Sequence, residues 1–298
     1  MSTFLTQFER DLALRNLRPS TRILYLGRVR AFTRHFGRCP SKMGEAEVRE
    51  FLHHLVARGN KPSTINLHHS ILRFVYGTTL GRPEVMACVP RAIPRPNPRI
   101  PPLTTPEVRA VLKAVGGDVY EHAIVTTLLE TGLRRSELCG LQVTDIDRKA
   151  GYVHVREGKG GRPRIVNLSE RLYSCLRLYW KACRPHRPWV FNARHPGAPK
   201  QTCLVPPWQN QPLQPNTLDN LLGRVGKRAG LRRNLSAHDF RRTYATLLLE
   251  QGVHRSTLQS LLGHASPTTT DRYLTVRPTV IHRVPSPLAR VYGDAALG

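Results

Sequence analysis

A proline-rich segment constrains the fold of this chain more than any other feature. Within "VPRAIPRPNPRIPPL", residues 89–103, six prolines are interleaved with arginines and apolar residues. Proline lacks a backbone N–H and fixes φ, which forbids a helix here and predicts an extended, fairly stiff segment. We therefore expect a linker over 91–102, with one domain over 1–90 and a second domain over 103–276.

The first 90 residues predict a small helical domain. Apolar residues recur at helical spacing in four stretches, with start and stop signals such as Ser63 and Gly59. Four short helices of this kind can bury one core together. The four stretches cover residues 3–17, 18–37, 45–59 and 61–77.

The second domain predicts a mainly helical fold with a small β-sheet, so the chain as a whole is α+β. Thr104 can cap a helix that carries Pro106 early in it. "GYVHVREGKGGRPRIVNL" alternates outward and inward residues, turns at its glycines and returns, which is typical of a β-hairpin. Further helices are expected over 169–183, 216–229, 238–251 and 255–262, with a loop over 185–215.

The charge of the chain indicates a polyanionic partner. Lys and Arg number 46 against 20 Asp and Glu, a formal net charge of +26. Residues 1–100 carry a net +11 and residues 101–298 a net +15, so the excess is spread over both parts. Such a charge favours nucleic acid, and its distribution suits two domains that close on the same duplex as a clamp.

Composition also excludes several classes of protein. The six cysteines form no CxxC pair, so neither a disulfide framework nor a zinc site is indicated. No apolar run reaches the roughly 18 residues of a transmembrane helix. The first residues are charged throughout and lack the apolar core of a signal peptide. We expect a soluble protein of the reducing cytoplasm, with no membrane partner.

Four polar stretches of the second domain carry the candidate chemistry: "TGLRRSEL", "GKGGR", "LSAHDFRRTYATLLL" and "LLGHASPTTTDRYL". Arginine binds the nonbridging oxygens of a phosphodiester in bidentate fashion and stabilises the negative charge that gathers there in the transition state. A tyrosine can then act as nucleophile, and a lysine can protonate the departing sugar oxygen. Because no cluster of acids accompanies these residues, the set predicts phosphoryl transfer without a metal.

Taken as an ordered set, the four stretches resemble the tyrosine recombinase family, also called phage integrases, of the Xer and Cre type. The resemblance spans about residues 104–276, and the first domain is similar to the helical, SAM-like core-binding domain of that family. It implies a catalytic domain of the DNA breaking-rejoining type.

The resemblance implies a role for three residues in the first half of the catalytic domain. Arg134 corresponds to the first catalytic arginine, and Glu137 to the acidic residue that supports the site without contacting the substrate. Lys159, at the tip of the hairpin, corresponds to the general acid toward the 5′-oxygen.

The second half of the domain supplies the remaining matches. His238 and Arg241 correspond to the family's H-x-x-R pair, and His264 to its histidine-or-tryptophan position. Tyr273 corresponds to the nucleophile that becomes joined to a 3′-phosphate. Asp239 stands where the family usually has a neutral residue, so its carboxylate is expected to point away from the phosphate.

Several residues compete with these assignments or extend them. Considered on the residues alone, the competitors are Arg242 for Arg241, Tyr244 and Tyr292 for Tyr273, and Lys113 and Lys181 for Lys159. The residues expected to contact DNA elsewhere are Arg22, Lys61, Arg91, Arg95 and Arg99. The tail over 277–298 has apolar spacing at Ile281, Val284, Leu288 and Val291, which suggests docking in trans on a neighbouring protomer.

The sequence therefore predicts a site-specific DNA recombinase of the integrase or transposase type. It would need no metal, cofactor or ATP, and its partner would be double-stranded recombination sites bound by a homotetramer in the bacterial nucleoid. The rival interpretations are a type IB topoisomerase, which uses the same chemistry as a single protomer, and a DNA-binding regulator that has lost catalysis.

The excess of basic residues generates a first prediction about binding. Because the basic side chains release counterions from the phosphates that they contact, affinity for duplex DNA should fall steeply with salt. A fluorescence-anisotropy titration should show the association constant falling about 1,000-fold or more between roughly 50 and 200 mM salt. An affinity that changes little over this range would contradict the predicted phosphate contacts.

Overall fold

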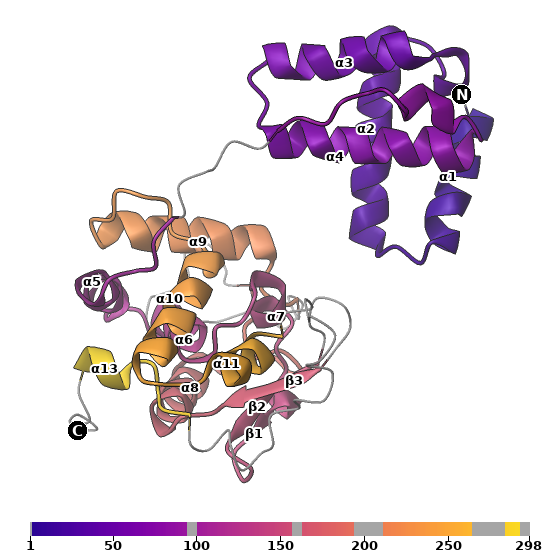
Figure 1. Cartoon of the computed structure of the whole chain (residues 1–298). Coiled ribbons are helices and arrows are strands. Elements are labelled where there is room, and N and C mark those ends of the chain that lie inside the picture. The colour runs from indigo at the N-terminus through magenta and orange to yellow at the C-terminus, as the bar shows by residue number, and fades with distance from the viewer. Residues whose placement is uncertain (1, 94–99, 157–162, 194–210, 264–283, 293–298) are drawn as a thin grey trace. The chain divides into compact units, whose positions relative to one another are not determined.

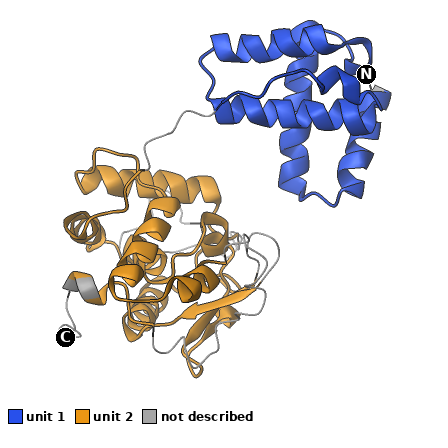
Figure 2. Ribbon diagram, viewed as in Figure 1, with its two compact units in different colours: residues 1–99 blue, residues 100–298 orange. Residues whose placement is uncertain are grey.

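The computed structural model divides into two compact units, residues 1–99 and 100–298 (Figure 2). The structure describes residues 2–93, 100–156, 163–193, 211–263 and 284–292. Each unit has its own apolar core, as the linker in the sequence suggests.

Among its described residues, the first unit contains four α-helices, with one short helical turn between the second and third helices and two after the fourth. Proline in the first turn starts two of the helices, because its missing N–H would have no intrahelical partner there. Glu47 starts the third by accepting a 2.8 Å hydrogen bond from the backbone N–H of Gly44. The Phe32 and Phe51 rings meet edge to face at 5.2 Å in the core. The helices are α1 (Ser2–Leu14), α2 (Pro19–Phe36), α3 (Glu45–Ala57) and α4 (Pro62–Phe74), with shorter turns at Pro40–Lys42, Val75–Thr79 and Pro83–Met86.

The second unit surrounds one buried helix, α6 (Val119–Thr131), with the other helices and one small sheet (Figure 1). Helix α6 is buried along almost its whole length and packs against α8 and α10. The other helices among the described residues of this unit are α5 (Thr105–Val115), α7 (Arg135–Cys139), α8 (Glu170–Cys183), α9 (Pro215–Arg228), α10 (Ala237–Glu250), α11 (Arg255–Leu262) and α13 (Ala289–Tyr292).

The sheet is antiparallel, with the strand order β1 (Ile146–Asp147), β2 (Tyr152–Val155) and β3 (Arg164–Asn167). Strands β2 and β3 form the predicted hairpin, with Val153 opposite Val166. The sequence did not predict β1 or α7, because such short elements leave no periodic pattern. Helices α8, α9, α10 and α11 lie within one residue of their predicted bounds, and the mainly helical fold class is confirmed.

The described part of the tail packs on its own catalytic unit. Val284, Leu288 and Val291 are buried in the cores of this unit, and the Arg109 guanidinium donates to the backbone oxygen of Val291 at 2.8 Å. The sequence analysis suggested that the tail docks in trans on a neighbouring protomer, and this stays a prediction; in the single chain these three residues pack on their own unit. Ile281 lies outside the described residues.

Two observations bear on the expectations drawn from composition. Cys183 is disulfide-bonded, which the sequence did not lead us to expect, because spacing along a chain does not reveal which cysteines meet in space. No helix among the described residues is long and apolar enough to cross a membrane.

The junction after α6 requires a glycine. Gly132 ends the helix at φ +59°, and a Cβ placed on it would lie 2.5 Å from the Tyr244 ring. Tyr244, on α10, is buried in a core cluster with Leu258 and Leu261 of α11, so a shift of its ring would disturb this packing.

We predict that Gly132→Ala lowers the free energy of unfolding by about 3 kcal/mol, because left-handed strain and overpacking add together. Gly252→Ala is the matched control: its φ of +82° is also positive, but nothing lies within 4 Å of an added Cβ. Urea unfolding should show a loss of only about 1 kcal/mol for the control. Equal losses for the two variants would contradict the packing argument.

Candidate active site

Arg134 and Glu137 form a rigid pair at the start of α7. Arg134 is the N-cap residue, and its backbone N–H donates to Oε2 of Glu137 at 2.8 Å. Its guanidinium returns to the same carboxylate, with Nη1 at 2.6 Å from Oε1. The spacing of three residues in "RRSE" produces this closed loop, because a side chain at the third helical position reaches back to the cap. Glu137 thereby fixes the direction of the Arg134 side chain.

Arg241 reaches the same place from α10. Its side chain is buried, and it donates from Nη1 to the backbone oxygen of Gly132 at 2.9 Å and from Nη2 to that of Leu262. Burial lowers the pKa of the Arg241 guanidinium to about 10, with the charges of Arg134 and Arg164 adding to the effect. The group therefore remains positively charged at neutral pH.

A third arginine, Arg164 at the start of β3, completes the cluster. Its Nη1 and Nη2 donate to the two oxygens of Glu137 at 2.8 and 2.6 Å, and its Nε donates to the backbone oxygen of Leu261 at 2.7 Å. The side chain is only 6% exposed. The sequence analysis did not identify it, since one arginine at a hairpin strand start carries no signal of burial.

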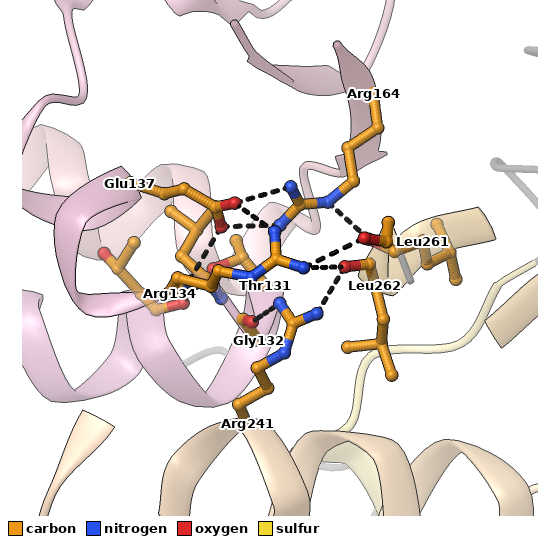
Figure 3. Close-up of polar contacts among 11 residues, drawn as sticks. Thr131, Gly132, Arg134, Glu137, Arg164, Arg241, Leu261 and Leu262 are labelled. Carbon is orange, nitrogen blue, oxygen red and sulfur yellow. Dashed lines mark hydrogen bonds and ion pairs between the residues drawn. The ribbon is translucent and has the colours of Figure 1, made fainter. Parts of the chain in front are cut away.

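The three guanidinium groups share the carboxyl end of α11 (Figure 3). Arg164 binds the Leu261 oxygen, Arg241 binds that of Leu262, and Arg134 binds that of Gly263 at 2.9 Å. The last carbonyls of a helix lack intrahelical donors and lie at the negative end of its dipole, so cations are favoured there. We call these four charged residues, the three arginines and Glu137, the Glu137 cluster.

The Glu137 carboxyl is ionised within this cluster. Burial alone would raise its pKa, but the hydrogen bonds and charge of Arg164, together with the hydrogen bonds of Arg134, outweigh burial and hold the pKa below its usual value. Three guanidinium groups around one carboxylate leave a net positive charge, which suits a phosphodiester.

His238 lies one helical turn before Arg241, in the first turn of α10, with an exposed side chain. Partial burial, followed by the charges of Arg242 and Arg241, lowers the pKa of His238, so its imidazole is neutral near pH 7. The neighbouring Asp239 turns away, as expected. Its carboxylate accepts from the backbone N–H and the hydroxyl of Ser236 at 2.9 and 2.6 Å.

The structure thus brings together three residues predicted from sequence, Arg134, Glu137 and Arg241. Lys159, His264 and Tyr273 lie outside the described residues. Among the residues predicted to contact DNA, Arg95 and Arg99 also lie outside. The other three, Arg22, Lys61 and Arg91, are at least partly exposed in the first unit.

The structure describes the side chains of four competing residues. Arg242 is half-buried and donates to the backbone oxygen of Ile100 at 3.2 Å, away from the Glu137 cluster. Tyr244 is buried in the core, where burial raises the pKa of its phenol. Lys113 and Lys181 are exposed on α5 and α8. Within the described part of the chain, no group of three or more His, Cys, Asp or Glu residues could hold a metal ion.

A cluster of arginines on a mainly helical unit, in a chain that also has a separate helical unit, is typical of DNA breaking and rejoining enzymes. The phage integrase family matches residues 102–279, and the N-terminal SAM-like domain of phage integrases matches residues 4–84. The chain belongs to the phage integrase family and is a tyrosine recombinase.

Individual relatives support this membership. A Sinorhizobium fredii protein named as an integrase/recombinase, y4qK, is 32% identical over 289 residues, covering 96% of this chain and 89% of the relative. The tyrosine recombinase XerD of Mycobacterium leprae is 30% identical over 263 residues, covering 82% and 81%.

Solved structures share the fold. A lambda integrase fragment, solved as a dimer on a COC′ core site, gives a TM-score of 0.67 at 21% identity and covers 90% of this chain and 96% of that one. The Tn1549 transposon integrase, in complex with circular intermediate DNA, gives 0.66 at 19% identity and covers 99% and 96%.

We predict that Glu137→Gln lowers the free energy of unfolding by about 3 kcal/mol at pH 7, because two guanidinium groups lose their shared counter-charge. The native pKa of Glu137 is depressed, so this stabilisation is present above its unfolded pKa and is lost as pH falls through the native value. Urea unfolding should therefore show the two proteins converging below pH 4.5.

Glu107→Gln provides the matched control in the same unit. Glu107 caps α5 by accepting from the backbone N–H of Thr104 at 2.8 Å, but its side chain is 34% exposed. Its replacement should cost about 1 kcal/mol or less. A loss as large as that of Glu137→Gln would show that capping alone, and not the buried charge, accounts for the effect.

Proposed function

We propose that this recombinase cleaves one DNA strand at a time through Tyr273, with Arg134 and Arg241 holding the scissile phosphate. The observation that carries the proposal is the convergence of these two arginines, from α7 and α10, around the buried Glu137. Their side chains arise from separate segments of the fold, and each is held by hydrogen bonds before any DNA is bound.

The proposed reaction exchanges one phosphoester bond for another. The Tyr273 oxygen attacks phosphorus, the bond to the 5′-oxygen breaks, and a 3′-phosphotyrosyl bond forms. Lys159 gives the departing 5′-oxygen its proton. The 5′-hydroxyl of a partner strand then attacks the phosphotyrosine and releases the phenol. Because the bonds formed and broken are of the same kind, no ATP is needed.

The arginines stabilise negative charge on the phosphate, and the histidines accept a proton or donate a hydrogen bond. Negative charge grows on the nonbridging oxygens in the transition state, and fixed guanidinium groups stabilise it more than they stabilise the ground state. His238, whose lowered pKa leaves it neutral, can accept the proton of the attacking phenol. His264 would add a further hydrogen bond to the phosphate. A metal ion has no step to perform in this scheme.

We propose double-stranded recombination sites as the partner and a homotetramer as the assembly, in the cytoplasm where such DNA lies. Two duplexes with two exchanged strands each require four nucleophiles. A related fold, lambda integrase, has been solved as a tetramer bound to a Holliday junction, with a TM-score of 0.68 at 20% identity. The basic residues Arg22, Lys61, Arg91, Arg95 and Arg99 would contact the phosphate backbone.

The test uses nicked suicide duplexes tiled across the DNA that flanks the gene, after footprinting has located the bound site. We expect the unsubstituted protein to form a covalent adduct on denaturing gels. Tyr273→Phe should abolish the adduct and leave DNA binding within about twofold, since a single hydroxyl is removed.

Tyr244→Phe is the matched control, because it also removes one phenol hydroxyl from the catalytic unit. That hydroxyl is buried and without a hydrogen-bond partner among the described residues, so its loss should cost nothing in adduct formation. An adduct that persists in Tyr273→Phe would refute the assignment of Tyr273 as the nucleophile. Relaxation of a plasmid that lacks paired sites would favour topoisomerase activity over recombination.

A further inference from the structure

Arg134 and Arg241, which we assign to the phosphate, also make hydrogen bonds within the protein. Arg134 donates from Nη2 to the backbone oxygens of Leu262 and Gly263 at 3.3 and 2.9 Å, and Arg241 donates to the oxygen of Leu262. These carbonyls close the carboxyl end of α11, immediately before His264. When one of these N–H groups donates to a phosphate oxygen, it no longer donates to a backbone carbonyl. DNA binding would therefore weaken the hydrogen bonds between the two arginines and the end of α11.

Arg164 is placed differently. All three of its guanidinium nitrogens donate to protein atoms: two to Glu137 and one to the Leu261 oxygen. Its side chain is 6% exposed and that of Glu137 is 3% exposed, whereas that of Arg134 is 23% exposed. Arg241 is also buried, but its hydrogen bonds go to the backbone oxygens of Gly132 and Leu262 and not to Glu137 (Figure 3). Arg164 is therefore the arginine of the Glu137 cluster that remains attached to both elements when a phosphate occupies the others.

We propose that Arg164 is a positioning residue for strand cleavage, a fixed bridge that holds Glu137 and the end of α11 in register while Arg134 and Arg241 bind the scissile phosphate. This inference rests on the proposed function. Through Glu137 the bridge sets the direction of Arg134, and through Leu261 it sets where the chain leaves α11 toward His264 and Tyr273.

The planar fork of arginine is needed for this task. Two parallel bonds to a carboxylate fix the plane of the guanidinium, and that plane directs Nε at Leu261. Gly263 leaves room for the stem: a Cβ on this residue would lie 3.1 Å from the Arg164 Cδ. A lysine retains the charge but makes no such three-point bridge. Arg164→Lys therefore tests the geometry of the bridge while the positive charge is kept.

The experiment measures the single-turnover rate of adduct formation at saturating protein, together with the dissociation constant for the same suicide duplex. For Arg164→Lys we expect the rate to fall about 10- to 100-fold, as for other misaligned sites. The dissociation constant should change less than about threefold, since Arg164 makes no DNA contact in this scheme. The rate constant is taken from the time course of adduct formation. The final amplitude is not used for it, because the amplitude depends on the fraction of active protein.

Two further variants separate positioning from folding. Arg164→Gln leaves a buried carboxylate poorly paired, so the substitution is also made in the Glu137→Gln background, where no buried anion remains. There it should still slow cleavage relative to Glu137→Gln alone, because the bond to Leu261 is lost. Arg228→Gln is the matched control, because it breaks the ion pair of another arginine with a buried carboxylate, that of Glu121 on α6.

The outcomes are distinct. Slow cleavage in the Arg164 variants, with a normal rate in Arg228→Gln, supports the inference. A normal rate in Arg164→Lys overturns it, as does a loss of amplitude alone that matches the loss of folded protein. Absence of any adduct from the unsubstituted protein would overturn the proposed function itself, and the inference with it.

Discussion

The catalytic unit depends on one buried anion. The Glu137 carboxylate binds the forks of Arg134 and Arg164, and it also caps the helix from which Arg134 projects. Arginines brought this close would repel one another without it. With it, the charges are held at fixed distances and a net positive charge remains for DNA. A single carboxylate thus serves folding and function together, because the geometry that neutralises it is the geometry that aims Arg134.

The positions of the cations follow from backbone constraints at two helix ends. Gly132 allows the chain to turn after α6, and its carbonyl then receives Arg241. Gly263 ends α11 in the same left-handed conformation, leaving open carbonyls for the arginines. Helix termini have unsatisfied polar groups that must find partners. Here the partners are the same side chains that we assign to the phosphate, so the protein occupies its binding groups before DNA arrives.

Local patterns were sufficient for much of this description. Caps and apolar spacing located four helices to within one residue, and the alternation around Tyr152 located the hairpin. The order of the four polar stretches along the chain, from "TGLRRSEL" to "LLGHASPTTTDRYL", identified the family that the relatives confirm. The pattern did not reveal Arg164, the cis packing of Val284, Leu288 and Val291, or the disulfide at Cys183. Each of these depends on contacts between segments far apart in the sequence.

The sequence by itself predicted the class of chemistry, since arginines, histidines, a lysine and a tyrosine without a cluster of acids favour phosphoryl transfer. Only the tertiary structure decided which arginine of the Glu137 cluster has a structural role. An arginine becomes structural when burial and a full set of acceptors occupy its donors, as for Arg164. Residue type and spacing along a chain do not encode burial by distant segments, so this distinction appears only when the helices and the sheet have come together.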